Sequence, residues 1–348
     1  MKDFEGLRVL VTGGTGSLGR ALVRRLLSGA VGHPSQVVVF SRDEAKQHYM
    51  RLEFHHRTAA TDDIIYRRAH EVLRFRIGDV RDYDALLGAL RQADVVFHAA
   101  ALKQVPTCEY FPFEAVLTNI TGARNLVHAI RHHDMPVRRV VGISTDKACK
   151  PINVMGMTKA LQERILIEGN HGGDGTDFLC VRYGNVIASR GSVVPLFLGQ
   201  IRAGGPVTIT LPEMTRFLLS LERAVDTVLA AALDGKRGET YIPRVPSATI
   251  VDLARAVMRV EGREVPIVET GLRPGEKVHE IMVSEEECFR TGERDGYYTI
   301  QPVLPELRDP SVATGVLSGE YSSMHDTVSV EAVQALLEEA TGEIASFA

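Results

Sequence analysis

The sequence predicts an α/β protein built on a doubly wound parallel sheet, with a smaller lobe in its C-terminal half. In the first half of the chain, short apolar runs rich in β-branched residues alternate with amphipathic stretches. This alternation is typical of parallel strands that helices cover on both faces. After about Tyr183 proline and glycine become frequent. We therefore expect one domain over residues 1–183, to which some later segments return, and mainly a lobe and a tail over residues 184–348.

Composition and charge exclude several classes of protein. The net charge of −4 gives no general affinity for nucleic acid or anionic membranes. No apolar run approaches the roughly 20 residues that span a bilayer. The four cysteines lack C-x-x-C spacing, and His128 and His132 have no third ligand, so we expect neither a disulfide framework nor a metal site. Residues 1–3 lead almost directly into a strand rather than a signal peptide, so we expect a cytoplasmic protein.

The predicted elements of the first half follow one another as strand and helix. The predicted strands are residues 8–12, 36–40, 73–77, 94–98, 138–144 and 178–182. The predicted helices are residues 18–28, 82–91, 113–132 and 155–169, and later 222–234, 250–262 and 330–341. The charged segment from Lys46 to His70 delays the third strand, so we expect an inserted helix or helical hairpin there. Its role stays open between an oligomer contact, a lid and a passive insertion.

A glycine-rich loop directly follows the first predicted strand and precedes the first predicted helix. Its spacing is G-x-x-G-x-x-G. The first glycine permits a tight turn, the second lets the backbone approach a pyrophosphate, and the third lets the helix pack closely. The helix N-terminus adds N–H donors and the positive end of its dipole. We therefore expect a Rossmann-type dinucleotide site whose contacts in this loop are Gly13, Thr15, Gly16, Ser17, Leu18 and Gly19.

The ends of the next strands extend this cofactor site. Ser41 and Arg42 end the second strand, and a hydroxyl followed by arginine favours the 2′-phosphate of NADP over the 2′-hydroxyl of NAD. An ordinary surface arginine stays open as the alternative. After the third and fourth strands, the expected cofactor contacts are Asp79, Val80, Ala99, Ala100 and Ala101.

The fifth strand ends in Ser-Thr-Asp-Lys, where a short-chain dehydrogenase carries Ser or Thr and then Tyr-x-x-x-Lys. Lys159 supplies the lysine, but Met155 stands at the position of the tyrosine. Either the protein is a catalytically inactive dehydrogenase, or Asp146 and Lys147 carry out the proton transfers instead of the tyrosine. The alternatives are a surface ion pair for Asp146 and Lys147, and a packing role for Met155.

Further motifs extend the resemblance over nearly the whole chain. The matching segments are residues 99–106, 144–148, 151–156, 182–186, 189–193, 214–217 and 273–277. With these motifs the sequence resembles the soluble, 5-inverting UDP-N-acetylglucosamine 4,6-dehydratases of the extended short-chain dehydrogenase/reductase family. The resemblance is greatest to capsule and O-antigen enzymes, several of which also carry methionine in place of the tyrosine.

The resemblance implies a nucleotide-sugar dehydration. Tightly bound NADP would be regenerated within each turnover, through oxidation at C4, loss of water across C5–C6 and return of hydride to C6. UDP-N-acetylglucosamine would become a UDP-2-acetamido-2,6-dideoxy-hexos-4-ulose with inverted C5, the L-arabino product. The resemblance also implies a homo-oligomer, either a dimer or a hexamer.

The resemblance and the chemistry together assign roles around the sugar. Asp146 is the expected acid at the C6 oxygen, Lys147 the C5 base, and Thr145 the donor near C4. A lysine base must be neutral part of the time, so we expect burial and the nearby cation Lys159 to lower the pKa of Lys147. Lys159 should also bind the nicotinamide ribose. Because Met155 cannot take the C4-hydroxyl proton, we assign that step to Lys147 or to a water assisted by Lys159.

Substrate binding and the competing functions complete the predictions. The expected substrate contacts are Lys103, Asn185, Arg216, Arg273 and Glu276, although ordinary salt bridges stay open for each. A UDP-sugar epimerase would share the C4 oxidation without needing the Asp146–Lys147 pair. A non-catalytic NADP-binding regulator would bind the cofactor without turning over any UDP-sugar.

Overall fold

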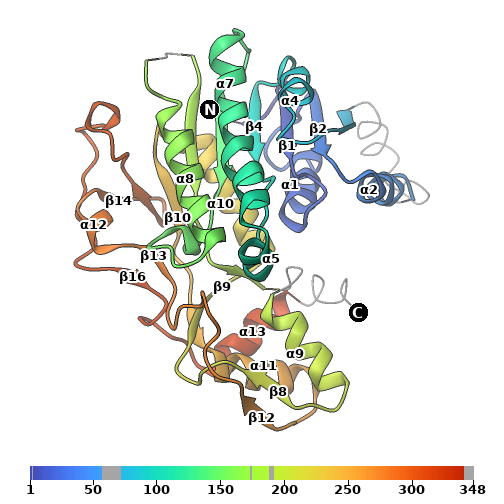
Figure 1. Ribbon diagram of the computed structural model, residues 1–348, viewed down its shortest axis with the longest axis vertical. Coiled ribbons are helices and arrows are strands. Elements are labelled where there is room, and N and C mark those ends of the chain that lie inside the picture. The colour runs from blue at the N-terminus through green and yellow to red at the C-terminus, as the bar shows by residue number, and fades with distance from the viewer. Residues whose placement is uncertain (2, 57–71, 173–174, 188–191, 341–348) are drawn as a thin grey trace.

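The strands of the first half of the chain form one twisted sheet (Figure 1). The structure is a computed structural model that describes residues 1, 3–56, 72–172, 175–187 and 192–340. The sheet has nine strands in the order β14-β15-β10-β6-β5-β4-β1-β2-β3. Its first six strands in chain order are β1 (Arg8–Thr12), β2 (Gln36–Ser41), β3 (Leu73–Ile77), β4 (Val95–His98), β5 (Arg139–Ile143) and β6 (Asp177–Val181). All six pair in parallel. The doubly wound α/β prediction is thereby confirmed.

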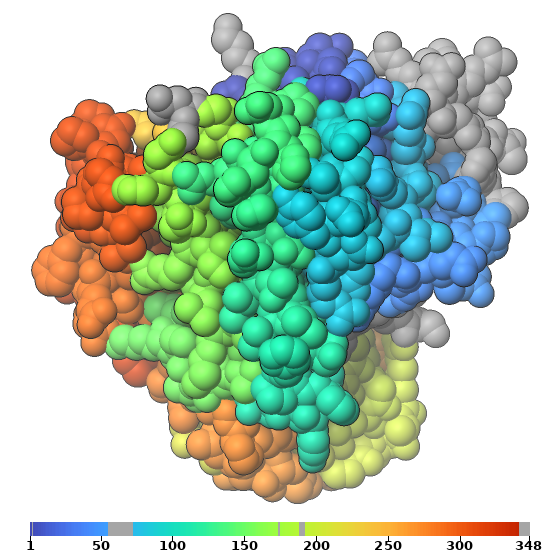
Figure 2. All heavy atoms as spheres, turned by 45° about the horizontal axis from the view of Figure 1, so that its top comes forward, coloured from blue at the N-terminus to red at the C-terminus, as the bar shows by residue number. Residues whose placement is uncertain are grey.

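Helices cover both faces of this sheet. On one face, α1 (Ser17–Leu27) and α10 (Leu221–Asp234) bury their apolar sides on the strands. On the other face lie α4 (Tyr83–Leu90), α7 (Gly122–His132) and α8 (Val154–Glu168). Figure 2 shows α4, α7 and α8 side by side. Both sides of the inner parallel strands are therefore shielded from water, which explains their nearly continuous apolar sequences, whereas the edge strand β3 alternates apolar residues with arginines and is partly exposed.

The helix predicted over residues 113–132 is interrupted. It consists of α6 (Pro112–Ala115), a wide π turn η2 (Val116–Thr121) and then α7. The π turn contains Asn119, whose buried amide donates to the Leu102 carbonyl and to the Thr158 hydroxyl and whose oxygen accepts from the Leu102 N–H. A single π turn inside a helix is a local feature that apolar periodicity does not reveal.

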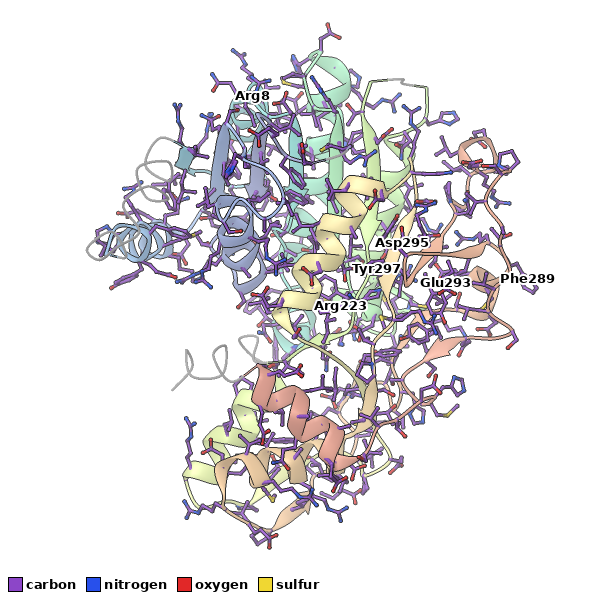
Figure 3. The ribbon with its side chains drawn as sticks, turned by 180° about the vertical axis from the view of Figure 1, so that it is seen from behind. Arg8, Arg223, Phe289, Glu293, Asp295 and Tyr297 are labelled. Atoms are coloured by element: carbon purple, nitrogen blue, oxygen red, sulfur yellow. The ribbon has the colours of Figure 1, made fainter. Side chains whose placement is uncertain are left out.

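Segments after residue 183 complete the sheet. β10 (Thr240–Pro243) pairs in parallel with β6, and the antiparallel strands β15 (Tyr297–Ile300) and β14 (Thr291–Arg294) follow. Arg223 of α10 and Tyr297 lie near one another on the side of the sheet that Figure 3 faces. The Arg223 guanidinium is 5.2 Å from the centre of the Tyr297 ring. β6 is consequently an inner strand of the sheet.

A second core lies in the lobe below the sheet in Figure 1. It is built from α9 (Val193–Arg202), β8 (Val207–Ile209), α11 (Ile250–Glu261), β12 (Ile267–Glu269) and α13 (Val330–Glu339). Small sheets connect it to the body through β7 (Asn185–Val186), β9 (Thr215–Leu219), β11 (Ser247–Thr249), β13 (Ile281–Val283) and β16 (Tyr321–Ser322). The remaining short helices are α5 (Val105–Tyr110), η3 (Asp146–Ala148), α12 (Glu285–Cys288) and η4 (Pro305–Leu307).

A buried ion triad ties the C-terminal half to the body. The Arg182 guanidinium lies 2.7 Å from a Glu163 oxygen and 2.8 Å from a Glu287 oxygen, and all three side chains are buried. The Ser144 hydroxyl donates to Glu163 as well. The triad therefore connects β6, α8 and α12 directly behind the end of β5.

The segment predicted as an inserted helix is only partly described. Its first part belongs to α2 (Glu44–His56), and residues 57–71 lie outside the described residues. Within the described parts of the chain, the search for a helix long and apolar enough to cross a bilayer finds none.

Candidate active site

A cleft of about 1800 Å³ follows the carboxyl ends of the parallel strands and continues against the lobe. Ligands of open α/β sheets bind at this edge. Every predicted cofactor and substrate residue lines the cleft, and so do Thr145, Lys147, Met155 and Lys159. Asp146 does not line it and is only 1% exposed. Gly184, which does line the cleft, lies beside Asp146, since a Cβ placed there would be 3.4 Å from Asp146 Oδ2.

The glycine loop has the shape that a pyrophosphate requires. Gly13 has a φ of +67°, and a Cβ there would lie 2.7 Å from the Ala100 nitrogen. A Cβ on Gly19 would lie 2.5 Å from the Gly14 Cα, so α1 packs directly on the loop. Gly16 is the N-cap of α1 and offers no side-chain cap to the first-turn N–H groups. The loop therefore fits a dinucleotide phosphate at the positive end of α1.

At the end of β2, the side chain available to a ligand in the cleft is that of Arg42, not that of Ser41. The Ser41 hydroxyl is buried and accepts from the Gln47 amide at 3.0 Å. The Arg42 side chain is 55% exposed, and its Nη1 lies 3.7 Å from Asp79 Oδ2. Arg42 can therefore turn toward a phosphate in the cleft without breaking a close ion pair.

The segment after β5 is held against the start of α8. Thr145 caps the short helix η3, and Asn153 caps α8 by accepting from the Gly156 N–H. A Cβ on Gly156 would lie only 2.3 Å from the Lys147 carbonyl oxygen, so only glycine allows this approach. The contact brings Lys147 next to the helix face that carries Met155 and Lys159.

Lys147 is the centre of a buried polar cluster. Its Nζ lies 3.1 Å from Asp146 Oδ1, 3.2 Å from Asn185 Oδ1 and 3.1 Å from Glu280 Oε1. Asp146 Oδ1 also accepts from the Thr145 hydroxyl at 2.8 Å. In the described part of the chain, Asp146 Oδ2 and Glu280 Oε2 are buried without a hydrogen-bond partner. Three acceptors saturate the three donors of a lysine ammonium.

The prediction that Lys147 has a lowered pKa is wrong for this state of the protein. Burial opposes its charge, but the Asp146 and Glu280 carboxylates outweigh burial and raise the pKa of Lys147. The cation that opposes this effect is Arg216, not the expected Lys159. Asp146 shows the opposite balance, because burial, despite the attraction of Lys147, raises the pKa of its carboxyl. The cluster thus favours the charged form of Lys147, while burial works against the ionised form of Asp146.

Lys159 and Met155 lie one helical turn apart on α8. The Lys159 ammonium donates to the Ile143 carbonyl at 2.5 Å and to Gln162 Oε1 at 2.7 Å. Burial lowers the pKa of Lys159 to about 8. Met155 is 4% exposed and packs with Cys108 and Ala115 while also lining the cleft. A thioether at this position offers no group that can take or give a proton near neutral pH.

The predicted substrate residues fall into two groups. Asn185 contacts Lys147 and so belongs to the polar cluster. The Arg216 guanidinium donates to two backbone carbonyls, those of Thr215 and Val278. Arg273 is exposed and lies 4.0 Å from Glu276, in a loop that Asn153 ties to α8 through the Gly275 carbonyl at 2.7 Å. Lys103, Arg216, Arg273 and Glu276 all line the cleft.

Glu280 is the cluster member that sequence reasoning missed. It follows the matched segment 273–277 by only three residues, so its position in the sequence was a signal. A glutamate before a short strand nevertheless gives no functional signal by itself. Only the fold brings Glu280 into contact with Lys147, which lies 133 positions earlier in the chain. Lys277, whose ammonium donates to the Cys149 carbonyl, joins the same wall of the cleft.

Known proteins share both the sequence and the fold of this chain. The UDP-glucose 4-epimerases of Rickettsia typhi and Rickettsia akari are 44% and 43% identical over 320 residues, which are 91% of this chain and 88% of each relative. The X-ray structure of Pen from Bacillus thuringiensis has a TM-score of 0.85 at 34% identity, covering 97% of this chain and 99% of that one.

A more distant structure shares the fold alone. DesIV, a dTDP-glucose 4,6-dehydratase from Streptomyces venezuelae solved with NAD, has a TM-score of 0.66 at 22% identity over 78% of this chain and 87% of that one.

Residues 9–302 match the family model described as "Polysaccharide biosynthesis protein". The chain therefore belongs to this polysaccharide biosynthesis protein family.

Proposed function

We propose that the protein is an NADP-dependent nucleotide-sugar 4,6-dehydratase that acts on UDP-N-acetylglucosamine and inverts C5. The observation that carries this proposal is the cluster of Asp146, Lys147 and Glu280 at a cleft that Lys159 also lines and where Met155 supplies no proton-transfer group. Dehydratases and epimerases of nucleotide sugars both appear among the relatives and fold neighbours. The proton chemistry of the cluster favours the dehydratase.

The cluster matches the demands of an elimination. A C4 ketone acidifies the C5 proton, and loss of water then needs a base at C5 and an acid at the C6 oxygen. Lys147 lines the cleft as the base. Asp146 lies buried beside Gly184 at the cleft wall and is the acid we assign to the leaving hydroxyl, because burial raises the pKa of its carboxyl. Thr145 is the donor for the developing C4 oxyanion. An epimerase that works through C4 alone has no use for the C5 base or the C6 acid.

The cofactor residues have separate roles. A bound nicotinamide dinucleotide supplies a reversible acceptor for the C4 hydride. The loop from Gly13 to Gly19 holds its pyrophosphate, Lys159 the nicotinamide ribose, and Arg42 the 2′-phosphate that distinguishes NADP from NAD. The C4-hydroxyl proton passes to Lys147 or to a water that Lys159 orients, since Met155 cannot accept it.

The substrate residues suit a nucleoside diphosphate. Lys103, Arg216 and Arg273 bring three cationic side chains to the same cleft, and cations are the usual partners of phosphate oxygens. Glu276 is the one acidic residue of this group, and a hydroxyl of the sugar or ribose is the partner we assign to it.

A UDP-sugar epimerase is the second candidate, favoured by the names of the Rickettsia relatives. The test is incubation of the protein and NADP with UDP-N-acetylglucosamine, and separately UDP-glucose, in deuterated water, read by NMR and mass spectrometry. The dehydratase gives a product lighter by one water, with a new C6 methyl group, deuterium at C5 and inverted configuration. NADPH does not accumulate.

The same experiment separates the other functions. An epimerase gives a C4 isomer of unchanged mass. A regulator binds NADP and leaves both sugars unchanged. Either of these results contradicts the proposed dehydratase.

A further inference from the structure

Glu280 reaches the polar cluster from the C-terminal half on a fixed backbone. It directly precedes β13, its N–H donates to Ser323 Oγ at 2.9 Å, and its carbonyl accepts from the Ser323 N–H at 2.8 Å. Ser323 Oγ lies 2.7 Å from Thr215 Oγ1. The Glu280 side chain is 3% exposed, with Oε1 on Lys147 and Oε2 buried and unpartnered within the described residues. A rigid frame thus holds a carboxylate with one spare oxygen at the cleft wall.

The contacts of Lys147 keep it protonated, so a nearby group must take its proton before it can act as a base. With three acceptors around it, Lys147 is a charged ammonium without a lone pair, and in that form it cannot act as a base. One proton must leave before Lys147 can take another from the sugar. Asn185 contributes an amide oxygen, which does not accept a proton near neutral pH. Asp146 Oδ1 already accepts from two donors, and Asp146 needs a proton of its own for the leaving oxygen.

We propose that Glu280 is a positioning residue that takes the proton of Lys147 and so releases the neutral amine that acts on the substrate. This inference rests on the proposed dehydratase function. The proton moves from Lys147 Nζ to a Glu280 oxygen, which leaves an amine and a carboxylic acid. The C4-hydroxyl proton leaves through the water that Lys159 orients, and the amine of Lys147 then takes the C5 proton, while Asp146 gives its proton to the departing C6 oxygen as water forms.

The formal charge of the cluster stays constant through these transfers. Before the reaction a protonated Asp146, a charged Lys147 and an ionised Glu280 sum to zero. After elimination an ionised Asp146, a charged Lys147 and a protonated Glu280 again sum to zero. Because an unpaired charge in a buried site is costly, a second carboxylate is what lets the lysine lose and regain a proton here.

The surroundings return the proton after each cycle. The charged groups facing Glu280 are Lys147 from η3, Arg216 from β9 and Lys277 from its own loop, with Asp146 across Lys147. Cys149 and His279 are the other titratable groups nearby. Burial opposes the charge of Glu280, but Lys147, Arg216 and Lys277 outweigh burial and hold its pKa below the ordinary value. In the resting state the proton therefore lies on Lys147.

The main test is Glu280→Gln, which keeps an oxygen for Lys147 but cannot accept its proton. We expect kcat for dehydration to fall about 10²–10³-fold while KM changes by less than about threefold. Glu280→Asp, a shorter group that can still accept a proton, should retain an intermediate kcat. Glu269→Gln, at an exposed position of β12 outside the cleft, is the matched control and should leave kcat unchanged.

The pH profile separates proton transfer from a merely structural role. Glu280 raises the pKa of Asp146, so its replacement by glutamine should move the alkaline limb of kcat toward lower pH. A Glu280→Gln enzyme that keeps kcat within about threefold of the wild type overturns the inference. So does a loss of activity that comes only from a higher KM with an unmoved profile.

A measurement without substrate distinguishes this inference from the proposed function. In protein carrying ¹³C at the lysine ε-carbons, the signal of Lys147, assigned with Lys147→Met, reports its titration by NMR. Its midpoint should fall by at least about one pH unit in Glu280→Gln and stay in place in Glu269→Gln. An unmoved midpoint overturns the inference. If the midpoint moves but wild-type protein dehydrates no UDP-sugar, the dehydratase proposal fails while the proton coupling stands.

Discussion

Lys159 carries a charge inside the protein, and that charge should cost stability in a way that depends on pH. Burial lowers its pKa from 10.5 to about 8. The difference, at about 1.4 kcal/mol for each pH unit, corresponds to about 3 kcal/mol. Below pH 8 the folded and unfolded states are both charged, so the folded state bears the full cost. Between pH 8 and 10.5 the folded state binds fewer protons, so the free energy of unfolding rises with pH through this window.

Lys159→Met removes the charge and with it the pH-dependent cost. The mutant also loses the hydrogen bonds to Ile143 and Gln162, but a neutral lysine can make these too, so their loss gives a nearly constant offset. We therefore expect the free energy of unfolding of the mutant, minus that of the wild type, to decrease by about 3 kcal/mol between pH 7 and 10.5.

Urea unfolding of both cofactor-free proteins across this pH range measures the difference. Other titrating groups contribute equally to both proteins and cancel. The control is Lys236→Met, at a surface lysine whose side chain is 45% exposed, which should change stability by less than about 1 kcal/mol at every pH. A difference between Lys159→Met and the wild type that stays constant within about 1 kcal/mol would refute the buried-charge account of Lys159.

Three further substitutions test separate parts of the structure. Asp146→Asn keeps the size of the side chain but removes the acid. We expect kcat for dehydration, measured by product formation, to fall about 10²–10³-fold with little change in KM. Activity near the wild-type level would show that Asp146 is not the acid. Met155→Tyr restores a phenol beside Lys159, and turnover should stay within about threefold because the cluster supplies the proton chemistry; a rise above about tenfold would mean that the native site lacks a group it needs. Arg182→Met leaves Glu163 and Glu287 buried without their cation, which should cost about 3–5 kcal/mol in urea unfolding, and a cost below about 1 kcal/mol would contradict the importance of the triad.

The six parallel strands of the first half could be predicted within one or two residues, most of them because strands buried on both faces read as continuous apolar runs, although the edge strand β3 alternates apolar residues with arginines. The glycine loop was equally readable, because its spacing reflects steric demands made by immediate neighbours. β14 and β15 were missed. Each has only four residues and pairs antiparallel, β14 at the sheet edge and β15 next to it, and each includes polar or glycine positions, so no long apolar run marks them.

The candidate site could be predicted as a set of residues but not as an electrostatic unit. The sequence indicates Asp146, Lys147 and Lys159, because motif spacing is local. The pKa of Lys147, which burial alone would lower, is raised first by Asp146 and then by Glu280, and only the fold brings Glu280 within 3.1 Å. The contact of Asn185 with Lys147 is also a tertiary contact that no spacing reveals.

The strands after residue 183 that join the main sheet limit where the chain can be truncated and which segments can be exchanged with those of a relative. β10 covers the edge of β6, and α10 supplies much of the apolar layer behind the first six strands. A fragment that stops near residue 183 would expose that edge and lose α10 from that layer, so we expect it to aggregate instead of binding dinucleotide. Exchange of sugar specificity with a relative should therefore transplant the separate stretches 192–217 and 244–283 together, leaving residues 221–243 and 291–300 with their own sheet.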